Sequence, residues 1–170
     1  MAWEATMRQV RSHDREVPAP RSRWDEIVPG LWMGGHVWAD GSGGLRPVVP
    51  DREFGLVVSL YTYPGHGPAP EVEHRVSVIP DGPLAAPQLD EVVRVAALTV
   101  RAVREGRPTL VRCFAGYNRS GLVTALALCG LGGLDASEAI TLIRRRRSPW
   151  ALHNETFVGY LLAGLPPVRA

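Results

Sequence analysis

One segment of the chain constrains the fold more than any other. Gly55–Tyr61 reads Gly-Leu-Val-Val-Ser-Leu-Tyr, a nearly continuous apolar and β-branched run. A strand with one solvated face alternates polar and apolar residues, whereas a continuous run is typical of a strand covered on both faces. Because such strands occur in parallel sheets flanked by helices, the run predicts an α/β fold.

The rest of the chain alternates between strand and helix patterns, as a parallel sheet requires. The predicted strands are Gly30–Gly34, Gly55–Tyr61, His74–Ile79 and Thr109–Arg112. The predicted helices are Gln88–Arg104, Ser120–Leu131, one that begins at Asp135 and ends in Arg144–Arg147, and a last one that begins at His153 or Asn154. We therefore expect a mostly parallel sheet of about four to five strands, with ligands bound at the C-terminal ends of the strands.

Length and composition favour one globular domain. The chain has 170 residues, of which 45% are hydrophobic and 21% are charged. These values suit a single core. Residues 1–26 are polar and arginine-rich and are predicted to be a loose N-terminal leader that can fold partly onto the domain. Residues 27–170 form the predicted domain, with Gly- and Pro-rich loops at Gly41–Pro50 and Tyr63–Pro70 that can shape the rim of a site.

Several classes of protein are disfavoured by the same simple features. A net charge of +2 is too small to predict nucleic-acid binding. No apolar run is long enough for a membrane span, and the N-terminus lacks the apolar core of a secretory signal. Two cysteines are too few for a disulfide framework, so a reducing cytoplasmic location is expected. The five histidines lack the spacing of metal ligands, and we predict neither a metal nor a cofactor.

The most informative stretch connects the strand Thr109–Arg112 to the helix Ser120–Leu131. It reads Cys113, Phe114, Ala115, Gly116, Tyr117, Asn118, Arg119 and Ser120. The backbone N–H groups of such a loop converge on an anion, and the N-terminus of the following helix adds its own unpaired N–H groups. The Arg119 guanidinium can bind two oxygens of a phosphate. Cys113 lies in the same positive field, which favours the reactive thiolate.

This loop resembles the signature loop of the cysteine-dependent protein phosphatases, in which five residues separate the cysteine from the arginine. The residues that sharpen the match are Ala115, Gly116, Tyr117, Arg119 and Ser120. The flanking segments resemble the dual-specificity branch of the protein tyrosine phosphatase superfamily, from about Ile27 to Leu162. The matching flanks are Ile27–Gly34, Phe54–Leu60, Asp135–Arg147, Asn154 and Phe157.

The resemblance implies a two-step hydrolysis of phosphotyrosine, and of phosphoserine or phosphothreonine as further candidates. Cys113 attacks phosphorus to give a cysteinyl phosphate, while Arg119 and the loop amides hold the phosphoryl oxygens. Asp81 protonates the leaving group and then activates water, and Ser120 donates to the Cys113 sulfur. The substrate is a phosphorylated protein or a small phosphomonoester. Asp90 and Glu91 are rival acids, but they belong to a helical pattern and are more typical of a surface.

Arg112 departs from the family pattern, which places a histidine directly before the nucleophile. That histidine hydrogen-bonds around the loop, whereas an arginine keeps the positive charge but cannot copy the short geometry. A second interpretation therefore stays open, a weak or inactive phosphatase-like module that binds phosphate or a phosphoprotein. Sulfur transfer by a rhodanese-like loop is disfavoured, because that loop is one residue shorter.

Other residues allow both a functional and a structural interpretation. Arg144–Arg147 is typical of a solvated helix end, with Arg147 as the member best suited to touch an anionic substrate. Asn154 is equally suited to cap a helix or to bind the acid-bearing loop. We expect Cys129 to be core and His66 and His74 to lie on the surface. Four aromatic residues are expected to serve packing: Trp32, Trp38, Phe157 and Tyr160.

Overall fold

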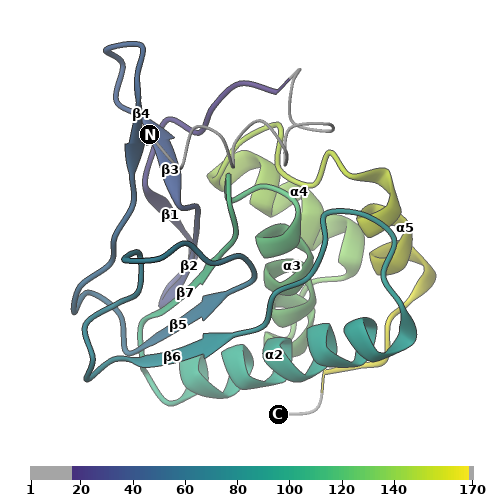
Figure 1. Ribbon diagram of the computed structural model, residues 1–170. Helices are drawn as coiled ribbons and strands as arrows, with labels where there is room; N and C mark the ends of the chain where they lie inside the picture. Colours follow the sequence, from purple (N-terminus) through teal and green to yellow (C-terminus); the bar gives the residue numbers. More distant parts are fainter. Residues whose placement is uncertain (1–16, 169–170) are drawn as a thin grey trace.

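A five-stranded sheet forms the centre of the protein in the computed structural model, which describes residues 17–168 (Figure 1). The strand order is β1 (Trp24–Val28), β2 (Leu31–Gly34), β7 (Thr109–Arg112), β5 (Leu56–Ser59) and β6 (Glu73–Val76). Only β1 pairs with its neighbour in the antiparallel direction, and the other three pairings are parallel. The predicted mostly parallel sheet is confirmed.

The two middle strands, β5 and β7, are buried along their whole length. Leu56 and Val58 belong to the main core, whereas Val57 and Leu110 pack with Phe54 in a second cluster. This division is what a strand covered on both faces requires, and it confirms the prediction from the continuous apolar run. The edge strand β6 is exposed at all four of its residues and is shorter than the predicted strand His74–Ile79.

The helices of the described part cover one face of the sheet (Figure 1). They are α2 (Ala86–Arg104), α3 (Arg119–Leu131), α4 (Ala136–Arg146) and α5 (Glu155–Ala163). Helix α3 is buried from Arg119 to Leu128, which its almost uniformly apolar sequence explains. Helix α4 begins as predicted, with a reciprocal capping box between Asp135 and Glu138. No helix within residues 17–168 combines the length and apolarity that a membrane crossing needs.

Two regions contain structure that the sequence pattern did not specify. Strand β1 begins at Trp24, and the Tyr117 hydroxyl donates to the carbonyl of Pro18 at 2.8 Å, so the folded unit begins before residue 27. The first sixteen residues of the predicted leader lie outside the described part. Strands β3 (Val37–Ala39) and β4 (Leu45–Pro47) form a hairpin that reaches into the predicted loop Gly41–Pro50. Both regions are short and mostly half-exposed, so they lack the apolar periodicity that would reveal them.

Candidate active site

The loop from Cys113 to Asn118 lies at the C-terminal end of β7, between that strand and the N-terminus of α3. Its shape is set by where its carbonyl groups point. Each carbonyl from Cys113 to Tyr117 accepts a hydrogen bond from the surrounding structure. The donors, in chain order of the acceptors, are His36 Nδ1 at 2.9 Å, His36 N at 2.7 Å, Arg147 Nη2 at 3.0 Å, Arg147 Nε at 3.1 Å and Leu152 N at 3.1 Å.

This outward pairing of the carbonyls determines where the amides point. In a trans peptide, the N–H of one residue points away from the C=O of the residue before it. The N–H groups of residues 114–118 are therefore turned to the inside of the loop. They converge there as a nest for an anion, next to the first-turn N–H groups of α3. Inward amides of this kind are what the predicted oxyanion cradle requires.

Glycine is required at two contacts of this loop. Gly116 has φ +74°, and a Cβ there would lie 2.4 Å from the carbonyl oxygen of Gly34 and 2.7 Å from Arg147 Nη2. On the facing segment, a Cβ on Gly35 would lie 2.7 Å from the carbonyl oxygen of Phe114. Because real Cβ atoms do not approach this closely, any side chain at either position would displace the loop.

Arg147 holds the loop from outside, which corrects the expectation that it touches an anionic substrate. Its side chain is 1% exposed and pairs with Asp25 at 2.8 Å, besides its bonds to the carbonyls of Ala115 and Gly116. Because the N–H groups of this guanidinium donate to protein acceptors, none is left to donate to a phosphate. The neighbouring Arg144–Arg146 are exposed, as a basic helix end should be.

We expect Arg147→Met to weaken inorganic phosphate binding at least about 10-fold, although Arg147 does not face the anion. Without Arg147 the loop shifts, and its N–H groups no longer point at the position of the phosphate. The variant should also lose about 2 kcal/mol or more of unfolding free energy, since it removes the ion pair of Asp25 and leaves the carbonyls of Ala115 and Gly116 without a donor. Calorimetric titration and urea denaturation measure the two effects. The matched control is Arg145→Met, an exposed arginine of the same helix; equal phosphate affinity in both variants would contradict the assignment.

The reactive groups meet inside this loop. Cys113 is 2% exposed, and its Sγ lies 3.3 Å from Ser120 Oγ. Arg119 is also buried; its Nη1 donates to the carbonyl of Ile79 at 3.4 Å, and its guanidinium lies 5.3 Å from the ring centroid of Tyr61. The Nε of Arg119 has no partner among the described residues. The arginine is thus oriented by its neighbours and retains a donor for a bound oxyanion.

Asp81 is tied to the same loop. Its carboxylate accepts from Asn118 Nδ2 at 3.0 Å and from Asn154 Nδ2 at 2.7 Å. Asn154 also caps α5, with its Oδ1 accepting from the amides of Thr156 and Phe157, so both interpretations of Asn154 hold at once. The segment after β6 that carries Asp81 runs past α3 on its way to α2 (Figure 1).

The rival acids lie elsewhere. Asp90 is exposed on α2, and Glu91 accepts from Ser77 at 2.6 Å and forms ion pairs with Arg75 and Arg94. These hydrogen bonds hold the pKa of Glu91 at about 2, against the opposing effect of its partial burial. A carboxyl group held ionised in this way is a poor proton donor at neutral pH, which leaves Asp81 as the candidate acid.

Tyr160 is a positioning residue that sequence reasoning assigned to packing alone. Its hydroxyl accepts from the backbone N–H of Leu84 at 2.9 Å, three residues beyond Asp81. The acid-bearing segment is therefore held by α5 at two points, Asn154 and Tyr160. A tyrosine on an apolar helix gives no sequence signal for such a contact, because the two residues are 76 positions apart.

Arg112 is a buried cation beneath the loop. It is 1% exposed, donates to Ser59 Oγ at 2.9 Å and to the carbonyl of His66 at 2.5 Å, and forms no ion pair with a described carboxylate. Burial lowers its pKa to about 10, so it stays charged at neutral pH. It does not bind around the loop as a histidine at this position would, but its charge stays close to the site, in agreement with the expectation of a retained positive field.

His36 supplies a hydrogen bond to the loop that the sequence did not reveal. It is 1% exposed and donates from Nδ1 to the carbonyl of Cys113, from a position 77 residues earlier in the chain. Burial, followed by the charge of Arg112, lowers its pKa to about 3. The imidazole is therefore neutral at pH 7, and its single proton lies on Nδ1 because a carbonyl can only accept. His36 thus fixes the peptide that carries the nucleophile.

The stability of the protein should fall as the pH drops from about 6.5 toward 4. In that range His36 takes up a proton in the unfolded chain but not in the folded one, so the unfolded state binds more protons. The titration of His36 lowers the free energy of unfolding by about 1.4 kcal/mol per pH unit in this range. His66 and His74, whose pKa values burial also lowers, add in the same direction.

Urea denaturation at several pH values checks this expectation, with His36→Gln as the comparison. The variant keeps His66 and His74, so its unfolding free energy should depend less steeply on pH than that of the native protein. Parallel pH profiles for the two proteins would show that His36 titrates alike in both states.

The predictions for His66, His74 and Cys129 have clear outcomes. His74 is exposed, as expected. His66 is only half-exposed, because its ring stacks on that of His36, with 5.7 Å between the ring centroids, and also packs beside Tyr63. Cys129 is half-buried and packs against the main core, and burial raises the pKa of its thiol. Within residues 17–168, no group of three histidine, cysteine or acidic side chains is placed to hold a metal ion.

Comparison with solved structures identifies the fold. Human DUSP28 aligns at 24% identity with a TM-score of 0.67, over 86% of this chain and 95% of that one. A mouse putative dual specificity phosphatase complexed with zinc tungstate aligns at 24% identity with a TM-score of 0.63, over 88% of each chain. A human tyrosine phosphatase-like serine/threonine/tyrosine-interacting protein aligns at 18% identity with a TM-score of 0.58, over 84% of this chain and 95% of that one. No family model matches the sequence, and a search of curated proteins gives no significant match.

Proposed function

We propose that this chain, which has the fold of the dual-specificity-type protein tyrosine phosphatases, hydrolyses phosphotyrosine through a cysteinyl-phosphate intermediate. Phosphoserine and phosphothreonine are further candidate substrates. The observation that carries the proposal is the link between Asp81 and the loop: Asn118, next to Arg119, holds the Asp81 carboxylate at 3.0 Å. This link supports the assignment of nucleophile, oxyanion cradle and proton donor to one site.

In the first step, the Cys113 thiolate attacks phosphorus, and the bond from phosphorus to the leaving oxygen breaks. The inward amides of residues 114–118 and Arg119 bind the three equatorial oxygens, whose charge they stabilise in the transition state. Protonated Asp81 donates its proton to the leaving oxygen, so the alcohol departs neutral. The products of this step are the free alcohol and phosphorylated Cys113.

In the second step, water attacks the phosphorus of the cysteinyl phosphate. Ionised Asp81 accepts a proton from this water, the sulfur–phosphorus bond breaks, and inorganic phosphate leaves. The Ser120 hydroxyl, 3.3 Å from Cys113 Sγ, donates to the sulfur as negative charge returns to it. The thiolate must stay reduced throughout, so we propose that the protein acts in the reducing cytoplasm.

The second candidate is a module that binds phosphate or a phosphoprotein without turnover. The observation that favours it is Arg112, which occupies the place of the expected histidine and does not contact the loop carbonyls. A phosphatase-like interacting protein shares the fold, so the fold alone does not decide between the two. His36 weakens this alternative, since it supplies the loop with an imidazole donor at the Cys113 carbonyl.

Hydrolysis of p-nitrophenyl phosphate in the presence of a metal chelator separates the two candidates. Turnover that persists with the chelator, and that extends to phosphotyrosine peptides, supports the phosphatase. Binding of inorganic phosphate by calorimetry without any release of p-nitrophenol supports the binding module. Phosphoserine and phosphothreonine peptides of matched sequence then establish the range of substrates.

A further inference from the structure

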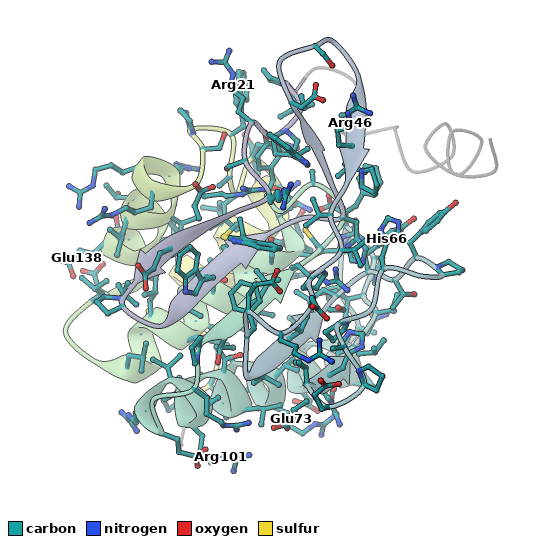
Figure 2. The ribbon with its side chains drawn as sticks, turned by 90° about the vertical axis from the view of Figure 1, so that its left-hand side faces the viewer. Arg21, Arg46, His66, Glu73, Arg101 and Glu138 are labelled. Carbon is teal, nitrogen blue, oxygen red and sulfur yellow. The ribbon has the colours of Figure 1, made fainter. Side chains whose placement is uncertain are left out.

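A second pocket lies beside the phosphate cradle and is not used by the chemistry above. Its volume is about 160 Å³. The lining residues are His36, Val37, Pro47, Tyr61, Tyr63, His66 and Phe114. His66 lies on the same side of the molecule as Arg46 of the β3–β4 hairpin, opposite Glu138 (Figure 2). Two segments predicted to shape the rim, Gly41–Pro50 and Tyr63–Pro70, therefore both contribute to this pocket.

The pocket is directly next to the catalytic loop. Phe114, which follows the nucleophile in the chain, forms one wall. Tyr61 separates the pocket from the phosphate site. The centroid of its ring lies 5.3 Å from the Arg119 guanidinium on the phosphate side. On the pocket side, the same centroid lies 5.4 Å from that of Phe114 and 5.3 Å from that of His36. The phosphate site and the pocket are thus separated by one aromatic ring. A substrate whose phosphate lies over Cys113 can reach the pocket with an adjacent group.

The size and walls of the pocket fit an aromatic ring. An apolar cavity of about 150 Å³ holds one benzene molecule. Five of the seven lining side chains carry aromatic rings, whose edges and faces favour a further aromatic ring in offset-stacked or perpendicular contact. None of the lining residues is acidic or permanently charged. Burial raises the pKa of Tyr61 and lowers those of His36 and His66, so all three are neutral at pH 7.

Two lining side chains also carry unpaired nitrogens. His36 Nε2 and His66 Nδ1 are buried and have no hydrogen-bond partner among the described residues. Because the proton of His36 lies on Nδ1, its Nε2 is an acceptor that lacks a donor. Both nitrogens are buried beneath the pocket surface, so a ligand in the pocket contacts the imidazole rings rather than these two atoms.

We propose that this pocket is a substrate subsite for an aromatic side chain, such as that of a phenylalanine or an unphosphorylated tyrosine near the phosphorylated residue. The proposal rests on the proposed function for the placement of the phosphate over Cys113. It narrows the substrate class to phosphopeptides with an aromatic residue close to the phosphorylated one. Transfer of such a ring from water to an apolar pocket strengthens binding about 10-fold or more.

The test uses the full chain with Cys113→Ser, so that binding is measured without turnover. The probes are five-residue phosphotyrosine peptides with alanine at all other positions, compared with peptides that carry one phenylalanine or one tyrosine at each flanking position in turn. At one or more positions, phenylalanine should lower the Kd about 10-fold relative to alanine. Tyrosine there should also bind more tightly than alanine, because its ring offers the pocket the same aromatic contacts.

Tyr63 provides the matched pair of variants, since its side chain forms no hydrogen bond among the described contacts and packs on His66 with a centroid distance of 4.8 Å. Tyr63→Ala, which removes a wall, should abolish the preference for the aromatic peptide, whereas Tyr63→Phe should keep it. Equal Kd values for all peptides, or a preference that survives Tyr63→Ala, would overturn the subsite. A preference with no hydrolysis by the native chain would instead refute the phosphatase and leave the subsite standing.

Discussion

Replacement of Cys113 with serine should abolish hydrolysis of p-nitrophenyl phosphate while inorganic phosphate and vanadate still bind. The loss of turnover should be at least about 10⁴-fold, because a serine hydroxyl at this position lacks both the nucleophilicity and the leaving ability of a thiolate. The cradle itself should persist. Its shape depends on carbonyl groups held by His36, Arg147 and Leu152, and none of these contacts involves the Cys113 sulfur.

The measurement is release of p-nitrophenol with a chelator present, together with calorimetric titration of phosphate. Cys129→Ser is the matched control, because it makes the same chemical change at a half-buried cysteine on α3 and should keep turnover near that of the native protein. Turnover retained by Cys113→Ser would refute the cysteinyl-phosphate route. Loss of phosphate binding in the same variant would show that the sulfur contributes to the shape of the cradle.

Asp81→Asn should have the second largest effect, a rate loss of about 10²- to 10⁴-fold that depends on the leaving group. An alkyl alcohol needs a proton to depart, whereas p-nitrophenolate departs more easily without one. The loss should therefore be larger for an alkyl phosphate than for p-nitrophenyl phosphate. An asparagine has nearly the same shape and can still accept from one of the two amides, Asn118 or Asn154, through its Oδ1, so the loop should stay near its place and phosphate affinity should change little.

Rates for a series of aryl and alkyl phosphates measure this dependence. Asp90→Asn is the control, since Asp90 is an exposed carboxyl on α2 and its loss should leave the series unchanged. A uniform loss across the series in Asp81→Asn would mean that another group protonates the leaving oxygen.

The parts of the fold that could be predicted are those set by neighbours in the chain. The apolar run through β5 marks a strand covered on both faces, and Asp135 with Glu138 marks a helix start, because each pattern acts over a few residues. Strand β1 could not be predicted in the same way. It is an edge strand in which only Ile27 is buried, so its pairing with β2 leaves little trace in its sequence.

The same distinction applies to the candidate site. By itself, the sequence determined which groups are proposed for the chemistry: a cysteine, an arginine and a serine in one loop at the end of a strand, with an aspartate in a Pro- and Gly-rich segment. The cysteine, the arginine and the serine can be recognised in the sequence because one short loop brings them together, whatever surrounds it. Only the tertiary structure decided what holds that chemistry in place: His36 at the Cys113 carbonyl, Arg147 at Gly116 and Tyr160 at the acid-bearing segment. Each of these contacts joins residues 31 to 77 positions apart, and hydrogen bonds over such separations are specified by the packing of the whole core rather than by any local pattern.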